Sequence, residues 1–219
     1  MRRAQALCSL VLALWGVPAP AAAAGGMELV VSLGAGVFVP TRDNWFVVNN
    51  PVFGMTGLGV DTLRPGVDLE LALSAWWGVF GAQVGVGYLA ASYDETSVAV
   101  VPVTALLRLR LPLGSFAPYL EGGGGVGFTS ATTPELVTGG TYPAPVASYG
   151  ASALEWLAGV GAELDLGSFR LGGSVRYVWV ERSALSSSSS VPLRYANPGM
   201  RFDLDGFTAT VNAGYRFGL

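Results

Sequence analysis

Twelve charged residues recur at alternate positions of otherwise apolar stretches, so in extended strands their side chains would share one face. Arginine and carboxylate groups that share a confined face form ion pairs and charge-assisted hydrogen bonds. Such a set either seals the interior of a protein against water or gates a narrow conductance through it. The candidates are Glu28, Asp68, Glu70, Arg108, Arg110, Glu121, Glu155, Glu163, Asp165, Arg170, Arg176 and Arg216.

The residue types that are missing exclude several function classes. The 219 residues contain no His, which removes most hydrolase triads, imidazole metal sites and near-neutral proton switches. A pI near 4.9 lacks the basic footprint of a nucleic-acid-binding protein. The acidic pairs Asp94–Glu95 and Asp203–Asp205 fall in connections, where we expect them to be solvated and at most weak Ca²⁺ ligands. We therefore expect no catalytic residue, no cofactor and no resident metal.

The elements that would position the charged set are strands, because the sequence alternates with a period of two. In each stretch one face is apolar and free of charge, and the other carries Gly, Ser, Ala and the charged residues. The eight predicted strands cover residues 28–37, 67–77, 80–90, 103–111, 120–128, 155–166, 169–179 and 207–219.

The chemistry of the two faces indicates the surrounding medium. A soluble barrel or sandwich also alternates, but its solvated face is expected to be rich in Lys, Glu and Thr, and this chain has no Lys. A face of Gly, Ser and Ala with occasional charges suits a crowded lumen. The opposite faces suit hydrocarbon, where an Arg costs about 2–4 kcal/mol at the midplane. We therefore predict an all-β, eight-stranded, antiparallel, up-and-down transmembrane β-barrel with the charged set inside.

The connections alternate in length as such a barrel requires. Tight connections are expected at Gly78, 112–115 and 167–168, with a modest one at 91–97. Long ones, rich in Ser, Thr, Gly and Pro, are expected at 39–64, 129–153 and 181–206. Tight turns on the periplasmic side and long external loops are typical of outer-membrane barrels, and an even strand number places both termini on the periplasmic side.

Aromatic residues gather near the predicted strand ends and indicate two belts at the membrane interfaces. The belt near the tight turns is expected to contain Trp76, Trp77, Phe80, Phe116, Tyr119, Phe169, Tyr215 and Phe217. The belt near the long loops is expected to contain Tyr88, Tyr93, Phe128, Trp156, Tyr177, Trp179 and Phe207.

The first 24 residues are predicted to be a secretory signal peptide, with the barrel domain spanning 25–219. Arg2 and Arg3 precede an apolar run, which small residues follow up to Ala24. The apolar run is shorter than the roughly 20 residues of a transmembrane helix. A second candidate helix, residues 71–93, is long enough and uncharged. Against it, the glycines at 81, 85 and 87 keep one parity, and Phe80, Val84, Val86 and Tyr88 keep the other.

The last strand carries the pattern Asn212-x-Gly214-x-x-Phe217-x-Leu219. It is similar to the terminal signal that the barrel-assembly machinery reads, and the Pro- and Gly-rich segment 118–128 resembles a strand common in the same group. By these residues and the overall pattern, the chain resembles the small OmpA/OmpX-like outer-membrane barrels. The resemblance implies a Gram-negative outer-membrane location. It also implies outer-membrane lipids, lipopolysaccharide and the assembly machinery as partners.

An eight-stranded barrel has an interior just wide enough for side chains, so an open diffusion porin is not expected. We predict a non-enzymatic structural or surface-interaction protein that acts through its external loops. Arg42, Arg64, Arg194 and Arg201 are candidate contacts for lipopolysaccharide phosphates. The alternative is a narrow channel or carrier of small apolar compounds of the OmpW-like type. A lipid-modifying enzyme is the third hypothesis, and the missing His counts against it.

Overall fold

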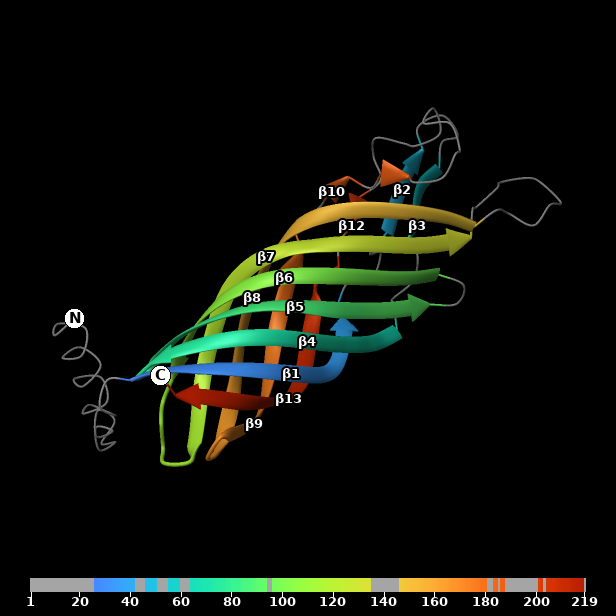
Figure 1. The fold of residues 1–219 in the computed structure, drawn as a ribbon. Helices are drawn as coiled ribbons and strands as arrows, with labels where there is room; N and C mark the ends of the chain where they lie inside the picture. The colour runs from blue at the N-terminus through green and yellow to red at the C-terminus, as the bar shows by residue number, and fades with distance from the viewer. Residues whose placement is uncertain are drawn as a thin grey trace.

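The computed structural model describes residues 26–41, 46–50, 55–59, 64–93, 96–134, 146–180, 183–184, 186–187, 201–202 and 204–218. Within them, eight long strands form one closed antiparallel barrel (Figure 1). These strands are β1 (Met27–Pro40), β4 (Arg64–Trp77), β5 (Phe80–Tyr93), β6 (Thr96–Arg110), β7 (Phe116–Pro134), β8 (Val146–Leu166), β9 (Phe169–Val180) and β13 (Gly206–Gly218). Each pairs with the next barrel strand along the chain, and β1 closes the barrel against β13. The predicted fold class is confirmed.

No helix in the described part of the chain is long and apolar enough to cross a membrane. The alternative of a transmembrane helix at 71–93 is wrong. These residues form the second half of β4, a turn and the whole of β5, and the two strands pair as a hairpin that starts with Trp77 opposite Phe80. The glycines that interrupt the apolar run follow the inward parity of β5, so the run has a two-residue rather than a helical period.

Three tight turns join strands at the end of the barrel where β1 begins and β13 ends (Figure 1). Gly78, Gly114 and Gly167 occupy these turns with φ values of 64°, 72° and 80°. Backbone in this left-handed region carries little cost only for glycine, because a Cβ would clash with the carbonyl oxygen. The expected tight connections are therefore confirmed.

Three strands extend further than the alternation predicts. β6 begins at Thr96, β7 runs to Pro134 and β8 begins at Val146, so the connection expected at 129–153 narrows to 135–145. In β6 the inward residues Val98 and Val100 are themselves apolar and buried. Both faces of that segment are then apolar, which removes the contrast that marks a strand in sequence.

Two of the connections expected as loops contain strands. β2 (Phe46–Asn50) and β3 (Met55–Gly59) lie in the segment 39–64, and β10 (Ser183–Ala184) and β12 (Arg201–Phe202) lie in 181–206. They form a second antiparallel sheet in the order β10-β12-β2-β3, at the end of the barrel opposite the termini (Figure 1). A short strand β11 (Ser186–Ser187) adds to β8. The first and last long connections are thus joined by backbone pairing.

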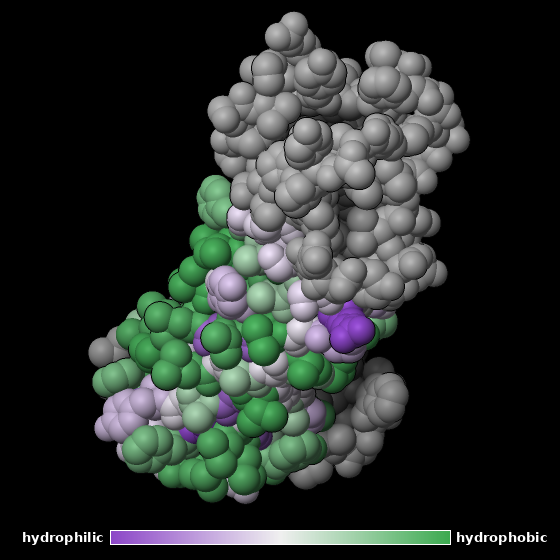
Figure 2. Space-filling view, turned by 90° about the vertical axis from the view of Figure 1, so that its right-hand side faces the viewer, coloured by the Kyte–Doolittle hydropathy of each residue, from purple (hydrophilic) through white to green (hydrophobic). Residues whose placement is uncertain are grey.

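The exterior of the barrel is apolar, as predicted. Outward residues such as Leu33, Leu107 and Val211 expose 66%, 73% and 71% of their surface. Hydrophobic residues dominate the described face in Figure 2. A continuous apolar surface of this extent is unfavourable in water and favourable against hydrocarbon, so the barrel has the exterior of a membrane-spanning protein.

Among the residues whose side chains are described, the aromatic belts are found with two corrections. The side chain of Tyr93 lies outside the described residues, and Tyr177 is half-buried against Trp179 and Phe207. Exposed rings near the turns are Trp77, Phe80, Phe116, Phe169, Tyr215 and Phe217, and those near the opposite end are Tyr88, Phe128, Trp156, Trp179 and Phe207. Trp76 and Tyr119 do not belong to the belt, because they are 0% and 3% exposed and face the lumen. Each is next in sequence to an outward residue, and successive strand residues point to opposite faces.

The lumen is polar over only part of its length. Inward residues of β1, β5, β6, β8 and β9 toward the end away from the turns are large and apolar: Phe38, Leu89, Val98, Val100, Leu157 and Val178. The predicted inward face of Gly, Ser, Ala and charged residues therefore describes only part of the lumen. Apolar packing closes the half of the barrel away from the turns, where Asp68 and Glu155 also lie, and the other inward charged residues lie toward the turns.

Candidate functional site: the charge network in the barrel lumen

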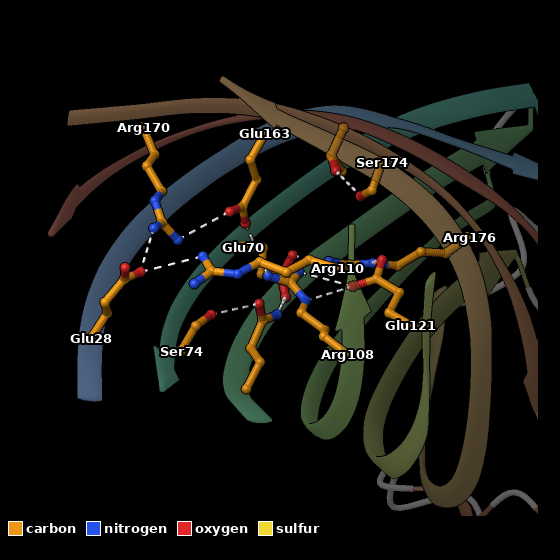
Figure 3. Close-up of polar contacts among 12 residues, drawn as sticks. Glu28, Glu70, Ser74, Arg108, Arg110, Glu121, Glu163, Arg170, Ser174 and Arg176 are labelled. Atoms are coloured by element: carbon orange, nitrogen blue, oxygen red, sulfur yellow. Dashed lines mark hydrogen bonds and ion pairs between the residues drawn. The ribbon is translucent and has the colours of Figure 1, made fainter. Parts of the chain in front are cut away.

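The charged residues predicted to face inward do face the lumen, and ten of the twelve are joined by ion pairs. Figure 3 shows the part of this network that runs from Glu28 to Arg176. They come from β1, β4, β6, β7, β8, β9 and β13 and occupy the inward parity of each strand. Because barrel closure turns all inward faces toward one axis, residues far apart in the chain meet in the lumen.

At the turn end of the network, Glu28 is the shared carboxylate. It pairs with Arg170, with Arg110 at 3.3 Å and with Arg216 at 3.9 Å. Arg216 Nη1 also lies 2.7 Å from Asp165 Oδ2, and Arg170 Nη2 lies 3.8 Å from the same oxygen. Three guanidinium groups thus share two carboxylates at the end of the barrel where the tight turns lie.

The middle of the network is a chain of alternating charges. Arg170 Nη1 donates to Glu163 Oε2 at 3.2 Å, and the other oxygen of Glu163 lies 3.7 Å from Arg108 Nη1. Arg108 and Arg176 then hold the two oxygens of Glu121, Arg108 through Nη2 at 2.8 Å and Arg176 through Nε at 2.6 Å. Each arginine in this segment therefore bridges at least two acids.

The network ends at two neutral side chains, Gln83 and Ser74, which were not among the predicted site residues. Arg176 Nη1 donates to Glu70 Oε2 at 2.7 Å, and Gln83 Nε2 donates to Glu70 Oε1 at the same distance. Ser74 Oγ donates in turn to Gln83 Oε1 at 3.1 Å. The inward parity of Ser74 and Gln83 was the available signal for both.

Two buried rings support the arginines. The guanidinium of Arg110 lies 4.4 Å from the ring centre of Trp76, and that of Arg108 lies 4.8 Å from the ring centre of Tyr119. A planar guanidinium stacked on an aromatic face gains cation–π attraction, which strengthens when water is excluded. These rings fix the arginine side chains in the lumen rather than anchoring the barrel at an interface.

Charge balance makes this packing possible. The connected network contains five arginines, Arg108, Arg110, Arg170, Arg176 and Arg216, and five acids, Glu28, Glu70, Glu121, Glu163 and Asp165. The side chains of Arg108, Arg170 and Arg176 are only 5–6% exposed. A buried charge without a partner is strongly unfavourable, so each of these side chains depends on its partners.

The remaining two predicted residues, Asp68 and Glu155, are not brought into this network. They are 5% and 2% exposed, and neither lies within ion-pair distance of an arginine in the described part of the chain. Both face the lumen on the side away from the turns. The sequence placed them correctly on the inward faces but gave no indication that they lack an arginine partner.

The predicted terminal assembly signal divides between both faces of β13. Asn212 and Gly214 face the lumen, Phe217 is exposed on the exterior, and Leu219 lies outside the described residues.

Asp205, expected to be solvated, is 3% exposed and accepts a hydrogen bond from the backbone N–H of Val180 at 2.9 Å. That expectation is wrong because Leu204 and Asp205, which precede β13, pack into the end of the barrel away from the turns. The side chains of Asp94, Glu95 and Asp203 lie outside the described residues.

The arrangement fills the lumen instead of leaving a passage. Cavities in the described lumen have volumes of about 30, 10 and 10 Å³, enough for one or two water molecules at most. No cluster of three metal-ligating side chains occurs among the described residues. The fold and lumen together define a small eight-stranded membrane barrel with a salt-bridged interior.

Comparison with known proteins supports this class. A major outer membrane protein from Thermus thermophilus superposes with a TM-score of 0.59 at 14% identity, covering 87% of this chain and 99% of that one. Neisserial surface protein A superposes with a TM-score of 0.53 at 8% identity, covering 87% of this chain and 97% of that one. No family model and no curated protein matches the sequence. At these identities the likeness shows the fold of the small outer-membrane barrels.

Proposed function

We propose that this protein is a non-enzymatic barrel of the bacterial outer membrane that acts through the segments outside its barrel. The observation that carries the proposal is the packed lumen, in which a charge-balanced network from seven strands and buried apolar side chains leave only small cavities in the described part of the chain. A barrel with a filled interior and an apolar exterior has its remaining chemistry at its two ends. Among the described residues, one end of the barrel has three tight turns and the ends of β1 and β13, whereas the other carries the sheet β10-β12-β2-β3, so this second end is the candidate interaction surface.

The sheet β10-β12-β2-β3 supports a recognition role at that end. It is built from the first and last of the long connections and stands at the end opposite the termini (Figure 1). Segments held by backbone pairing present a more constant surface than separate loops, which lowers the entropy lost on binding a partner. We propose that this end faces the outside of the cell.

The location and the partners belong to the same proposal. Outer-membrane lipids would contact the apolar exterior, and lipopolysaccharide would surround the external end. Arg64, the first residue of β4, is exposed at that end, whereas the side chains of Arg42, Arg194 and Arg201 lie outside the described residues. Export by residues 1–24 and recognition of β13 by the barrel-assembly machinery stay predictions, and residues 1–25 lie outside the described part.

The filled lumen favours this proposal over the narrow channel of the OmpW-like type. Ion flow would require the pairs around Glu121 and Arg108 to separate. The lack of His in the sequence argues in the same direction against a lipid-modifying enzyme. Planar-bilayer recordings of purified protein are expected to show no discrete conductance steps, and steps abolished by Arg108→Ala would favour the channel.

Surface labelling of intact cells tests the orientation. An epitope inserted between β2 and β3, at residues 51–54, is expected to bind antibody on intact cells. The same epitope at Gly167–Ser168, in a turn at the opposite end, is expected to bind only after the cells are opened. A heat-modifiability gel of the outer-membrane fraction verifies that both variants are folded. Labelling at the turn alone would reverse the orientation and remove the proposal.

A further inference from the structure

The charges of the lumen do not sum to zero. Seven acids face inward against five arginines, and the connected network uses five of the seven. Asp68 and Glu155 are the two that remain, both more than nine-tenths buried. Ionised carboxylates without a compensating charge are strongly disfavoured in a site of this kind. The structure therefore contains two buried acids that form no ion pair among the described residues. Asp68 has only the Coulombic attraction of Arg176, which Glu70 and Glu121 already hold, and no described positive charge acts on Glu155.

The two acids line one cavity. Asp68 on β4 and Glu155 on β8 stand on opposite walls of the barrel and border the cavity of about 30 Å³. Glu155 Oε1 is buried there and has no hydrogen-bond partner among the described residues, and Thr208 borders the same cavity. Buried polar atoms in folded proteins are paired with protein, water or an ion, so an unpaired carboxylate oxygen at a cavity indicates an occupant.

The described side chains around Glu155 offer no partner for its free carboxylate oxygen. Leu89, Leu157 and Val178 surround the cavity on the side away from the network. A Cβ on Gly127 would lie 3.0 Å from Glu155 Oε2 and 3.0 Å from Val100 Cγ1, so the carboxylate occupies space that only glycine leaves. Arg176 also borders the cavity, but its guanidinium is held by Glu70 and Glu121.

We propose that a small, hard cation binds in the lumen between Asp68 and Glu155. Carboxylate and hydroxyl oxygens are the ligands that such cations prefer. The cavity is large enough for one ion with a water molecule and too small for an organic cation. Because the described residues form no compact group of three acidic ligands, water completes the coordination. The ion neutralises the acids that the arginine network leaves unpaired.

Thermal unfolding of the full chain, purified and folded in lipid vesicles, tests the proposal. NaCl and CaCl₂ are compared with N-methyl-D-glucamine chloride at equal ionic strength, since the organic cation does not fit the cavity. The apparent Tm is expected to rise by about 5 °C when the bound cation reaches about a hundred times its Kd. Response to Na⁺ or to Ca²⁺ alone identifies the charge of the ion, and either response supports the site.

Matched variants locate the effect. Glu155→Gln and Asp68→Asn are expected to abolish the response, and because each removes an unpaired buried charge, both variants should fold without the cation. Asp165→Asn, which changes an acid of the network at the turn end, is expected to keep the response. Equilibrium dialysis with radioactive Na⁺ or Ca²⁺ gives a second readout, with one ion per barrel in the wild type and none in Glu155→Gln.

Three outcomes would overturn the proposal. Equal Tm values in all three salts would mean that no small cation binds. A response that persists in both Glu155→Gln and Asp68→Asn would place any bound ion elsewhere. Stabilisation of the wild type by acidification alone, without a cation effect, would identify a proton as the compensating charge.

Discussion

Arg108 holds one oxygen of Glu121 with two nitrogens, Nε at 2.9 Å and Nη2 at 2.8 Å from Oε2. β6 and β7 place the two residues directly opposite each other in register. The other oxygen of Glu121 accepts from Arg176 Nε at 2.6 Å. Glu121, whose side chain is 1% exposed, therefore connects arginines of β6 and β9 across the lumen. Two-nitrogen contacts of this kind fix geometry as well as charge.

Loss of Arg108 is expected to destabilise the barrel strongly. The Arg108→Met variant leaves Glu121 with one arginine and Glu163 with Arg170 alone. Breaking a buried pair by removing one partner lowers the free energy of unfolding by about 3–5 kcal/mol. Because Glu121 and Glu163 each keep one arginine, we expect a loss at the lower end of this range, about 3 kcal/mol. Urea unfolding in lipid vesicles, followed by tryptophan fluorescence, measures the change in the free energy of unfolding.

Removal of both partners should cost less than the sum of the single losses. In Arg108→Met/Glu121→Met, four arginines and four acids remain, with Arg176 on Glu70 and Arg170 on Glu163. The coupling energy is expected to exceed about 1 kcal/mol, since residues in one ion-pair network are not additive. Strictly additive losses would mean that the two side chains do not depend on each other.

The apolar exterior predicts that an introduced charge destabilises the barrel by an amount that depends on its depth in the bilayer. Val103 lies on the outside of β6 near its middle and is 50% exposed. Val103→Arg is expected to lower the free energy of unfolding in bilayers by about 2–4 kcal/mol, because the midplane of the hydrocarbon does not solvate a guanidinium. Leu109→Arg, close to the turn, serves as the control and is expected to cost about 1 kcal/mol or less. Equal costs at the two positions would contradict hydrocarbon contact.

The turn between β8 and β9 predicts a backbone effect without a packing effect. Gly167 has φ of 80°, nothing lies within 4 Å of an added Cβ, and its N–H donates to Asp165 Oδ1 at 3.0 Å. Gly167→Ala is expected to cost about 1–2 kcal/mol, the penalty of a left-handed conformation for an L-residue. Gly122→Ala, whose Cβ would have Leu157 O at 3.6 Å as its nearest neighbour, should be nearly neutral by the same urea assay.

The buried ring of Trp76 makes Gly81 a packing position. A Cβ on Gly81 would lie 2.5–2.8 Å from three atoms of the Trp76 ring. Gly81→Ala is expected to cost about 1–3 kcal/mol through overpacking and to shift the tryptophan fluorescence. In the Trp76→Leu background the same change should cost clearly less. An unchanged cost there would assign the effect to the backbone of β5 instead of the ring.

Much of the fold could be predicted from the alternation of apolar and polar residues along the chain. Strands such as 80–90 were predictable because Phe80, Val84, Val86 and Tyr88 keep one parity and Gly81, Gly85 and Gly87 the other, with Leu89 as the one large apolar residue on the glycine face. The part of β6 from Thr96 to Val101 was not, because Val98 and Val100 face an apolar part of the lumen and erase the contrast. The sheet β10-β12-β2-β3 was also missed, since it pairs two connections that lie far apart in the chain.

The candidate site shows the same division. Inward placement of Glu70 and Arg176 follows from parity within their own strands, which is a local property. Their contact at 2.7 Å, across 106 residues, follows only from closure of the barrel. Trp76 illustrates the limit of composition, because its ring type suggested an interface belt whereas its parity placed it beside Arg110 in the lumen.

The sequence alone determined that eight strands alternate, which of their faces carries charge, and that catalysis by His is excluded. These properties are local, because side chains on a strand point to opposite sides whatever the strand pairs with. Only the tertiary structure decided which acids find an arginine and which two, Asp68 and Glu155, are left at a cavity. That choice depends on the stagger with which the barrel closes, and the stagger is set by pairing between strands rather than by any one of them.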